Sequence, residues 1–320
     1  MNYSLDIIVP AYNAADKIST LLQSFEKQKR TDFRVIIVDD GSTDHTYDFC
    51  RGASQKSAYS ILVLTQQNQG PGIARQTGFK QADADYVMFC DADDYLHETA
   101  IDHLITILKK EPLDILEFGY RKITEQGAMI PSVYLKDEKF FGNCLEHYIK
   151  QKNTTNYLCN KVFKRQLLKV SDFKKLYYSE DARALALIFS RCTSYRVVSD
   201  PYYFYVINKD SACGKAYDLR RLDTVQVDEE ICGLVAGKNP QLLPFAACTA
   251  CVHTAKIYSG LKNAGLLDGE LDRTLKTVFD RRYRELSCEK GQVYKTRSRR
   301  QILAVELFRI SPSLFSILSR

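Results

Sequence analysis

The sequence predicts an α/β protein that begins with Rossmann-like βαβ units and ends in a helical C-terminal extension. In the first part of the chain, short apolar runs with β-branched and aromatic residues alternate with amphipathic helical patterns. Polar or turn-forming residues follow these runs, as is typical of strands whose carboxyl ends carry ligand loops. After about Ser211 the pattern changes to helices. We therefore expect one domain over residues 1–210 and a helical region over residues 211–320.

The composition is that of a folded globular protein of 320 residues with a formal net charge of +6. A charge of this sign favours an anionic partner. The ten cysteines show no disulfide framework spacing, and no signal-peptide pattern precedes the first strand, so we expect a cytoplasmic protein. No apolar run approaches the ~20 residues of a membrane span, so any membrane contact should be peripheral.

The first two predicted strands each end at a polar segment. Leu5–Val9 leads into Pro10-Ala11-Tyr12-Asn13, and a helical apolar pattern follows. The second strand, Phe33–Val38, ends at Asp39-Asp40-Gly41-Ser42-Thr43-Asp44. Strand, helix and strand in this order form a βαβ unit.

A third strand, Ile61–Thr65, leads into a glycine-containing turn and helix start, Asn68-Gln69-Gly70-Pro71-Gly72-Ile73-Ala74-Arg75. Backbone N–H groups at such a helix start can face a phosphate. The predicted helix extends to Ala82 and is followed by a fourth strand, Tyr86–Cys90. These segments complete three βα repeats.

Three carboxylates follow the fourth strand within four residues, at Asp91, Asp93 and Asp94. A divalent cation held by Asp91 and Asp93 would balance this charge and bind nucleotide phosphates at the carboxyl end of a strand. The alternative is a solvated turn that leads into the next helix, because aspartate is common in turns and at helix starts.

The middle of the chain mixes predicted strands and helices. We expect a strand over Ile115–Tyr120, a helix over Phe141–Gln151, a short helix after Asn160–Phe163, and strands over Tyr195–Val198 and Tyr202–Ile207. A further helix begins near Ser179, which puts Glu180 and Asp181 in its first turn. The helix dipole favours carboxylates there whatever their function.

Five segments in this order resemble the family 2 glycosyltransferases, which have the GT-A fold with a mixed, mostly parallel sheet. They are Ile8–Asn13, Val38–Asp44, Asn68-Gln69-Gly70 with Ala74-Arg75, Asp91-Ala92-Asp93-Asp94, and Ser179-Glu180-Asp181. The resemblance covers roughly residues 4–210. It implies a hexosyltransferase-type enzyme that uses a nucleotide-sugar donor, a glycan or lipid-linked acceptor, and Mg²⁺ or Mn²⁺. It implies no nucleic-acid partner.

The resemblance also assigns roles to residues. Those expected at the donor are Pro10, Ala11, Tyr12, Asn13, Asp39, Asp40, Gly41, Ser42, Arg75, Asp91 and Ala92. Asp39 or Asp40 would accept a hydrogen bond from uracil, which makes the donor look like a UDP-sugar. Asp93 would bind the metal directly, with Asp91 facing the metal or the ribose. Asp181 looks like the catalytic base, which would remove the proton of the acceptor hydroxyl in a single inverting displacement.

Two departures and two alternatives accompany this interpretation. Gln76 stands where the family often has Asn, and the absence of Trp excludes the Gln-x-x-Arg-Trp motif of processive synthases, so we expect transfer of one sugar. A haloacid-dehalogenase-type phosphatase also opens with Asp-x-Asp after a strand, but Tyr95 stands where that family usually has Thr or Val. A non-catalytic nucleotide-sugar-binding or scaffold subunit is the other alternative.

Two features near the C-terminus need separate interpretations. Cys248, Cys251 and His253 lie in an Ala-rich helical pattern and predict a buried helix face, not a metal or redox site. From Lys295 onward, basic residues precede apolar residues that extend to Leu318. This tail fits a helix on an anionic membrane at the inner face, a helix packed on its own domain, or a homodimer contact.

Overall fold

The computed structural model describes residues 3–132, 134–207 and 217–318. The chain divides into two compact units. The sheet unit comprises Met1–Leu145, Asn153–Leu176 and Leu187–Ser211, and the helical unit comprises Glu146–Lys152, Tyr177–Ala186 and Ala212–Arg320. The expected boundary at residues 210 and 211 lies outside the described residues.

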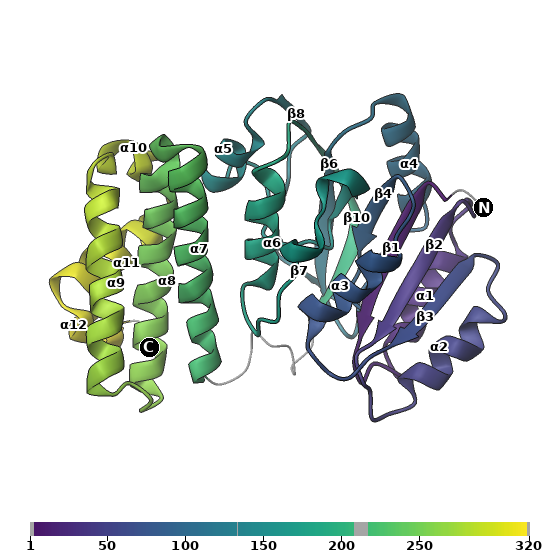
Figure 1. The fold of residues 1–320 in the computed structure, drawn as a ribbon, viewed down its shortest axis with the longest axis horizontal. Helices are drawn as coiled ribbons and strands as arrows, with labels where there is room; N and C mark the ends of the chain where they lie inside the picture. Colours follow the sequence, from purple (N-terminus) through teal and green to yellow (C-terminus); the bar gives the residue numbers. More distant parts are fainter. Residues whose placement is uncertain (1–2, 133, 208–216, 319–320) are drawn as a thin grey trace. The chain divides into compact units, whose positions relative to one another are not determined.

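One mixed sheet forms the sheet unit (Figure 1). Its strands are β1 Leu5–Ala11, β2 Phe33–Asp39, β3 Ser60–Thr65, β4 Tyr86–Phe89, β5 Tyr95–Leu96, β6 Ile115–Thr124, β7 Met129–Ile130, β8 Glu138–Phe141, β9 Lys161–Lys164 and β10 Ser194–Ile207. The main order is β3-β2-β1-β4-β9-β6-β10-β5, with β7 paired to β6 and β8 paired to β10. The first four strands in this order are parallel, and β9 runs antiparallel between β4 and β6.

The parallel register brings three strand ends to one edge of the sheet. Ala11 lies opposite Asp39, and Ile8 lies opposite Phe89. The loops after β1, β2 and β4 therefore start side by side, where open α/β sheets bind ligands.

Helices cover the sheet on both faces. In the sheet unit they are α1 Ile18–Glu26, α2 Thr46–Ser54, α3 Pro71–Gln81 and α4 Ala100–Lys110. Two further helices, α5 Cys144–Ile149 and α6 Glu180–Phe189, are each divided between the two units. Apolar side chains of α1 and α4 share a core with Ile7 and Val35, whereas Gly78 of α3 lies against Ile8 and Val38. Adjacent β1 residues thus face opposite helical layers, which explains why the buried strands read as continuous apolar runs.

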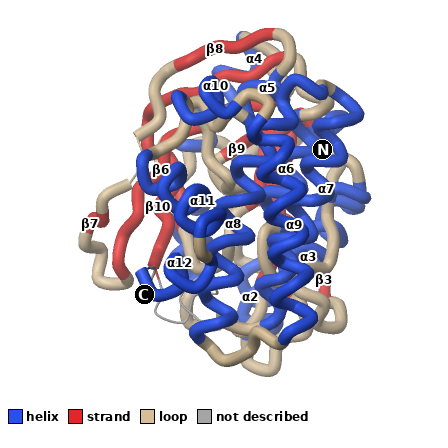
Figure 2. The backbone as a smooth tube through the Cα atoms, turned by 90° about the vertical axis from the view of Figure 1, so that its left-hand side faces the viewer, coloured by secondary structure: helices blue, strands red, loops and turns tan. Residues whose placement is uncertain are grey.

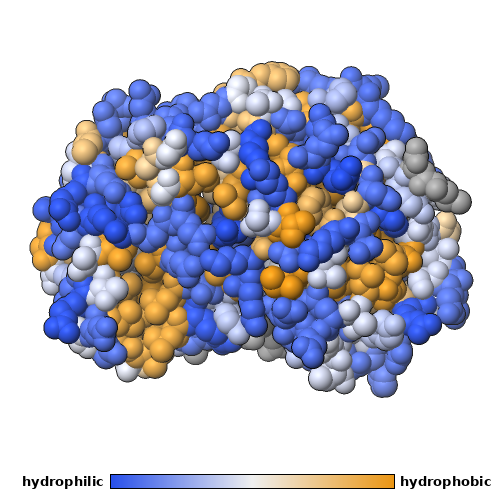
Figure 3. All heavy atoms as spheres, in the orientation of Figure 1, coloured by the Kyte–Doolittle hydropathy of each residue, from blue (hydrophilic) through white to orange (hydrophobic). Residues whose placement is uncertain are grey.

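The helical unit is built around α8. Its helices are α7 Leu222–Lys238, α8 Leu243–Asn263, α9 Gly269–Ser287, α10 Lys290–Lys295, α11 Arg299–Ile310 and α12 Pro312–Leu318. Cys248 and Cys251 are fully buried on α8, so the predicted buried helix face is confirmed. None of the helices in the described ranges is long and apolar enough to cross a bilayer. On the face drawn in Figure 3, hydrophilic residues surround separate hydrophobic areas.

Three expectations for the middle of the chain need correction. Phe141 lies in β8, and the helix after it is only Cys144–Ile149. Lys161–Lys164 forms β9, which was not predicted as a strand. The two strands expected on either side of Pro201 are one strand, β10, with register shifts on both sides of Pro201. Proline has no N–H to donate, so it is accommodated at an irregularity of the ladder.

Candidate nucleotide-sugar site

The loops after β1 and β2 are held together by side-chain hydrogen bonds. Ser42 Oγ accepts from the Asn13 N–H at 3.0 Å, and Asn13 Oδ1 accepts from the Thr43 N–H at 2.8 Å. Asn13 has a φ of 47°, a left-handed conformation that asparagine tolerates better than most residues. Pro10 and Ala11 end β1, and Tyr12 is exposed beyond them. The structure thus brings the predicted residues of these two loops together.

Asp39 and Asp40 are both buried, but their carboxylates differ in hydrogen bonding. Asp40 accepts from Gln66 Nε2 at 2.7 Å and from the backbone N–H groups of Gln69 and Gly70 at 2.9 and 2.7 Å. Asp39 Oδ2 accepts from Thr65 Oγ1 at 3.3 Å, whereas Asp39 Oδ1 is buried without a hydrogen-bond partner among the described residues. Asp40 therefore organises the β3–α3 loop, whereas Asp39 has one buried acceptor atom that no described residue satisfies.

Gly41 is required by the approach of this same loop. Its φ is +70°, and a Cβ there would lie 2.9 Å from the Asn68 nitrogen. Only glycine fits both the backbone conformation and the close approach.

Arg75 joins α3 to the acidic turn, which we define as Asp91–Asp94. Its buried guanidinium donates to Asp91 Oδ1 at 2.9 Å. The Asp91 side chain is 33 % exposed, so this carboxylate can still reach a ligand.

Asp94 holds the acidic turn to β10. It accepts from the Tyr203 hydroxyl at 2.6 Å and from the Val206 N–H at 2.7 Å. The Tyr203 oxygen in turn accepts from the Asp91 N–H at 3.1 Å. Burial, and then the charges of Asp91 and Asp93, raise the pKa of Asp94 well above its ordinary value. Asp94 thus anchors the turn that carries Asp91 and Asp93.

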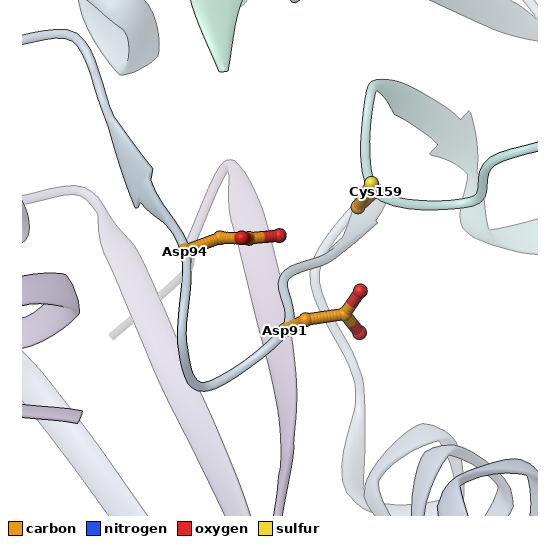
Figure 4. A group of neighbouring side chains, drawn as sticks. All are labelled: Asp91, Asp94 and Cys159. Carbon is orange, nitrogen blue, oxygen red and sulfur yellow. The ribbon is translucent and has the colours of Figure 1, made fainter. Parts of the chain in front are cut away.

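Asp91, Asp94 and Cys159 form a compact group (Figure 4). One oxygen of each carboxylate and the Cys159 sulfur lie within 4.8 Å of one another. Carboxylate oxygens suit Mg²⁺ and Mn²⁺, whereas a thiolate suits softer metals. Because both Asp94 oxygens already accept hydrogen bonds, Asp91 is better suited than Asp94 to be a ligand of a hard cation.

Asp93 lies two residues after Asp91 in the acidic turn. It is half-buried and lines an open pocket of about 300 Å³ in the sheet unit with Tyr95, Thr124 and Val206. The compact group found among the described residues consists of Asp91, Asp94 and Cys159. The metal role of Asp93 stays a prediction.

Glu180 and Asp181 lie in the helical unit at the start of α6. Ser179 precedes them with a φ of 62°, and its hydroxyl is 2.8 Å from that of Thr224 on α7. This contact fixes the beginning of α6 within the unit. Both carboxylates are half-buried.

The sequence interpretation missed Tyr203 and Cys159. Tyr203 is fully buried and contacts the acidic turn across 109 positions of sequence separation. The aromatic run that contains Tyr203 predicted a strand, but nothing in it indicated which side chain meets a carboxylate. Cys159 offered no signal, since it is one of ten scattered cysteines.

The sheet unit is thus an α/β fold with an antiparallel strand inserted in a mostly parallel sheet, and carboxylates follow β2 and β4 at the edge where such sheets bind ligands. The family model described as Glycosyl transferase family 2 matches residues 6–171, and the chain belongs to this family.

The relatives found include three bacterial proteins named as glycosyltransferases. The poly(ribitol-phosphate) beta-N-acetylglucosaminyltransferase TarS of Staphylococcus aureus is 27 % identical over 209 residues, which are 64 % of this chain and 35 % of TarS. TarP of the same species, with the same enzyme name, is 26 % identical over 211 residues, or 64 % of this chain and 63 % of TarP. The uncharacterized glycosyltransferase YibD of Escherichia coli is 32 % identical over 136 residues, or 41 % of this chain and 39 % of YibD. The chain therefore spans about a third of the length of TarS.

The crystal structure of Staphylococcus aureus TarS residues 1–349 in complex with UDP-GlcNAc has a similar fold. The TM-score is 0.66 at 22 % identity, over 91 % of this chain and 92 % of that one. The predicted family and the predicted GT-A fold with a helical C-terminal region are confirmed. The family match also favours a glycosyltransferase over the phosphatase that the acidic turn alone left open.

Proposed function

We propose that this chain transfers one sugar from a UDP-sugar to a hydroxyl of a glycan or lipid-linked acceptor, with inversion and without processivity. Membership of glycosyl transferase family 2 supports this proposal. The relatives named as N-acetylglucosaminyltransferases, and the TarS structure with UDP-GlcNAc, make UDP-GlcNAc the first donor to test.

The observation that carries the donor proposal is the buried, unpartnered Oδ1 of Asp39 in the described part of the chain. A buried carboxylate oxygen without a donor is costly, and the N–H of a uracil ring would supply one. Asp40 is less suited to this role because both of its oxygens already accept hydrogen bonds. We therefore assign uracil recognition to Asp39, with Pro10, Ala11 and Tyr12 around the base.

Mg²⁺ or Mn²⁺ fits the oxygen donors of the acidic turn. We assign the ion to Asp91 and Asp93, with Asp94 as the residue that anchors the turn. When bound, such an ion offsets the negative charge that develops on the departing diphosphate. Arg75 holds Asp91 in place and adds positive charge near the same phosphates.

Asp181 is the proposed general base. Its place in the first turn of α6 and its match to the family motif support this role. The carboxylate would take the proton of the acceptor hydroxyl as that oxygen attacks the anomeric carbon, and the bond to UDP breaks in the same displacement. Glu180 would assist by orienting the acceptor.

A donor panel tests this function directly. The full chain is incubated with Mn²⁺ and UDP-GlcNAc, UDP-glucose, UDP-galactose or GDP-mannose, and nucleotide release is followed with and without poly(ribitol phosphate) as acceptor. We expect slow release from one UDP-sugar alone, because water can replace the acceptor. Release should increase when a matching acceptor is present.

Equal release from GDP-mannose would contradict the UDP assignment. Nucleotide binding without any release would favour the non-catalytic alternative.

A further inference from the structure

The C-terminal helices α11 and α12 pack on α8 within the helical unit (Figure 2). Phe308 of α11 lies 5.0 Å from Tyr258, 4.5 Å from Phe279 and 5.8 Å from Phe315 of α12, measured between ring centroids. Packing within the helical unit therefore accounts for the apolar side chains on one side of these helices. It does not account for the apolar side chains on the other side.

The outer side of α11 and α12 carries large aliphatic side chains that are 45 % to 69 % exposed. They are Leu303, Ile310, Leu314, Ile317 and Leu318. Single exposed apolar residues are ordinary, but several on two adjacent short helices mark an interaction surface.

A groove of about 760 Å³ opens beside these side chains. Leu303, Leu307 and Phe315 contribute apolar walls, and Lys256 and Arg300 contribute two cations. None of the described residues that line the groove is acidic, and none of the described carboxylates forms an ion pair with either cation. The groove thus combines an apolar interior with unpaired positive charge.

We propose that the surface formed by α11, α12 and this groove docks on an anionic lipid bilayer, with an acyl chain in the groove and a lipid phosphate at Lys256 and Arg300. A lipid with an anionic headgroup is complementary to this groove, because it carries an apolar chain next to a negative charge. The proposal goes beyond the transferase function and does not depend on it.

A second copy of the chain fits this surface less well. A two-fold interface would bring the same patch of each copy together, so Lys256 and Arg300 of both copies would lie in one contact. Like charges opposed in an apolar contact are unfavourable. A bilayer with negative headgroups removes that conflict.

Vesicle flotation tests the proposal. The full chain is mixed with phosphatidylcholine vesicles, or with vesicles that contain about a third phosphatidylglycerol. We expect binding to the anionic vesicles, little binding to the neutral ones, and a loss of binding as salt concentration rises. Equal binding to both vesicle types, or no binding to either, would overturn the proposal.

Three variants locate the contact. Ile317→Asp should reduce flotation about tenfold or more, because it puts a negative charge where the helix meets lipid. Phe141→Asp makes the same charge change at an exposed apolar residue of β8 and should float like the unmodified chain. Lys256→Gln with Arg300→Gln should weaken binding about fivefold for each charge removed. This pair keeps the test valid if Ile317→Asp fails to fold.

Size-exclusion chromatography with light scattering separates the bilayer from a second copy. We expect the same molecular mass for the unmodified chain and for Ile317→Asp. A dimer that Ile317→Asp dissociates, together with no vesicle binding, would assign the surface to a second copy and overturn the proposal.

Discussion

Asp39 and Asp40 are adjacent buried carboxylates with different hydrogen-bond partners, so the proposed uracil contact of Asp39 can be tested separately from the loop contacts of Asp40. Asp39→Asn should lower UDP affinity by about ten- to a hundredfold, because one strong acceptor for the uracil N–H is weakened. Asp40→Asn should instead lower the melting temperature, because it weakens the hydrogen bonds that Asp40 accepts from the backbone N–H groups of Gln69 and Gly70. Calorimetric titration and thermal melts measure the two effects. Unchanged UDP affinity in Asp39→Asn would remove that residue from the base pocket.

Asp181 can be tested against its neighbour Glu180, which has the same charge and lies in the same helical turn. Asp181→Asn should reduce kcat by about two decades or more and leave UDP affinity unchanged, because a general base acts on the acceptor. Glu180→Gln should cost much less. Turnover is measured with the donor and acceptor identified by the panel. A near-normal rate for Asp181→Asn would exclude it as the base.

Single-residue chemistry could be predicted from the sequence only where it depends on local pattern. The carboxylates after Val38 and Cys90 were visible because each follows an apolar strand. The partner of Asp94, Tyr203, could not be predicted, because the contact depends on how β10 pairs in the sheet. The sequence also could not distinguish Asp39 from Asp40, because their partners lie on the β3–α3 segment some 26 to 30 positions later in the chain.

Strands β6 and β9 are joined by a fully buried ion pair, Lys161 Nζ to Glu117 Oε1 at 3.1 Å. Lys161 also donates to Thr155 Oγ1, and Glu117 accepts from the Tyr195 hydroxyl. Lys161→Met should destabilise the fold by about 3–5 kcal/mol, because it leaves the Glu117 charge buried without its cation.

The matched control is Lys139→Met, which removes a half-exposed lysine paired with Glu111. It should cost no more than about 1 kcal/mol, as is usual for surface ion pairs. Urea unfolding of both variants gives the comparison. Equal losses would mean that the buried pair adds nothing beyond a surface contact.

Helices α7 and α8 are joined by Asp228 and His253, whose Oδ2 and Nδ1 atoms lie 2.9 Å apart. Burial alone would lower the pKa of His253, and Lys256 and Arg297 also lower it. The charge and hydrogen bond of Asp228 outweigh these effects and raise the pKa above its ordinary value of 6.5. The pair should therefore stabilise the native state fully below pH 6.5, and the stabilisation should be lost as pH rises through the raised pKa.

Asp228→Asn tests this pH dependence. The melting temperature of the variant should fall below that of the unmodified chain at pH 6, and the difference should shrink at higher pH. Because the His253 side chain is 36 % exposed, the effect should be modest and should decrease with salt. A difference that does not change with pH would contradict the assignment.

Elements with strong periodicity were predicted well, and those defined by pairing were not. The sequence placed the strand Phe33–Val38 within one residue of β2, because a continuous apolar run is typical of a buried parallel strand. β9 is only Lys161–Lys164 and contains two lysines. One of them, Lys161, is buried together with its ion-pair partner Glu117. Such a strand has no local apolar pattern and exists because its neighbours pair with it.

At the scale of the whole molecule, the transferase proposal draws on residues of both units, and the lipid proposal draws on the helical unit alone. The proposed donor-binding residues belong to the sheet unit, whereas Asp181 and the proposed lipid-facing surface belong to the helical unit. The family could be predicted because five different motifs occur in the expected order along the chain. The acceptor could not be predicted, because the segment between Tyr120 and Tyr178 contains no motif that indicates a ligand.

The most direct test of the account is calorimetric titration of the full chain with UDP, GDP, CMP and inorganic phosphate, each with and without Mn²⁺. We expect selective UDP binding that Mn²⁺ strengthens by about tenfold or more, and loss of that enhancement in Asp93→Ala. UDP binding that is indifferent to Mn²⁺ in the unmodified chain would contradict the metal assignment. Binding of phosphate in place of UDP would contradict the donor assignment itself.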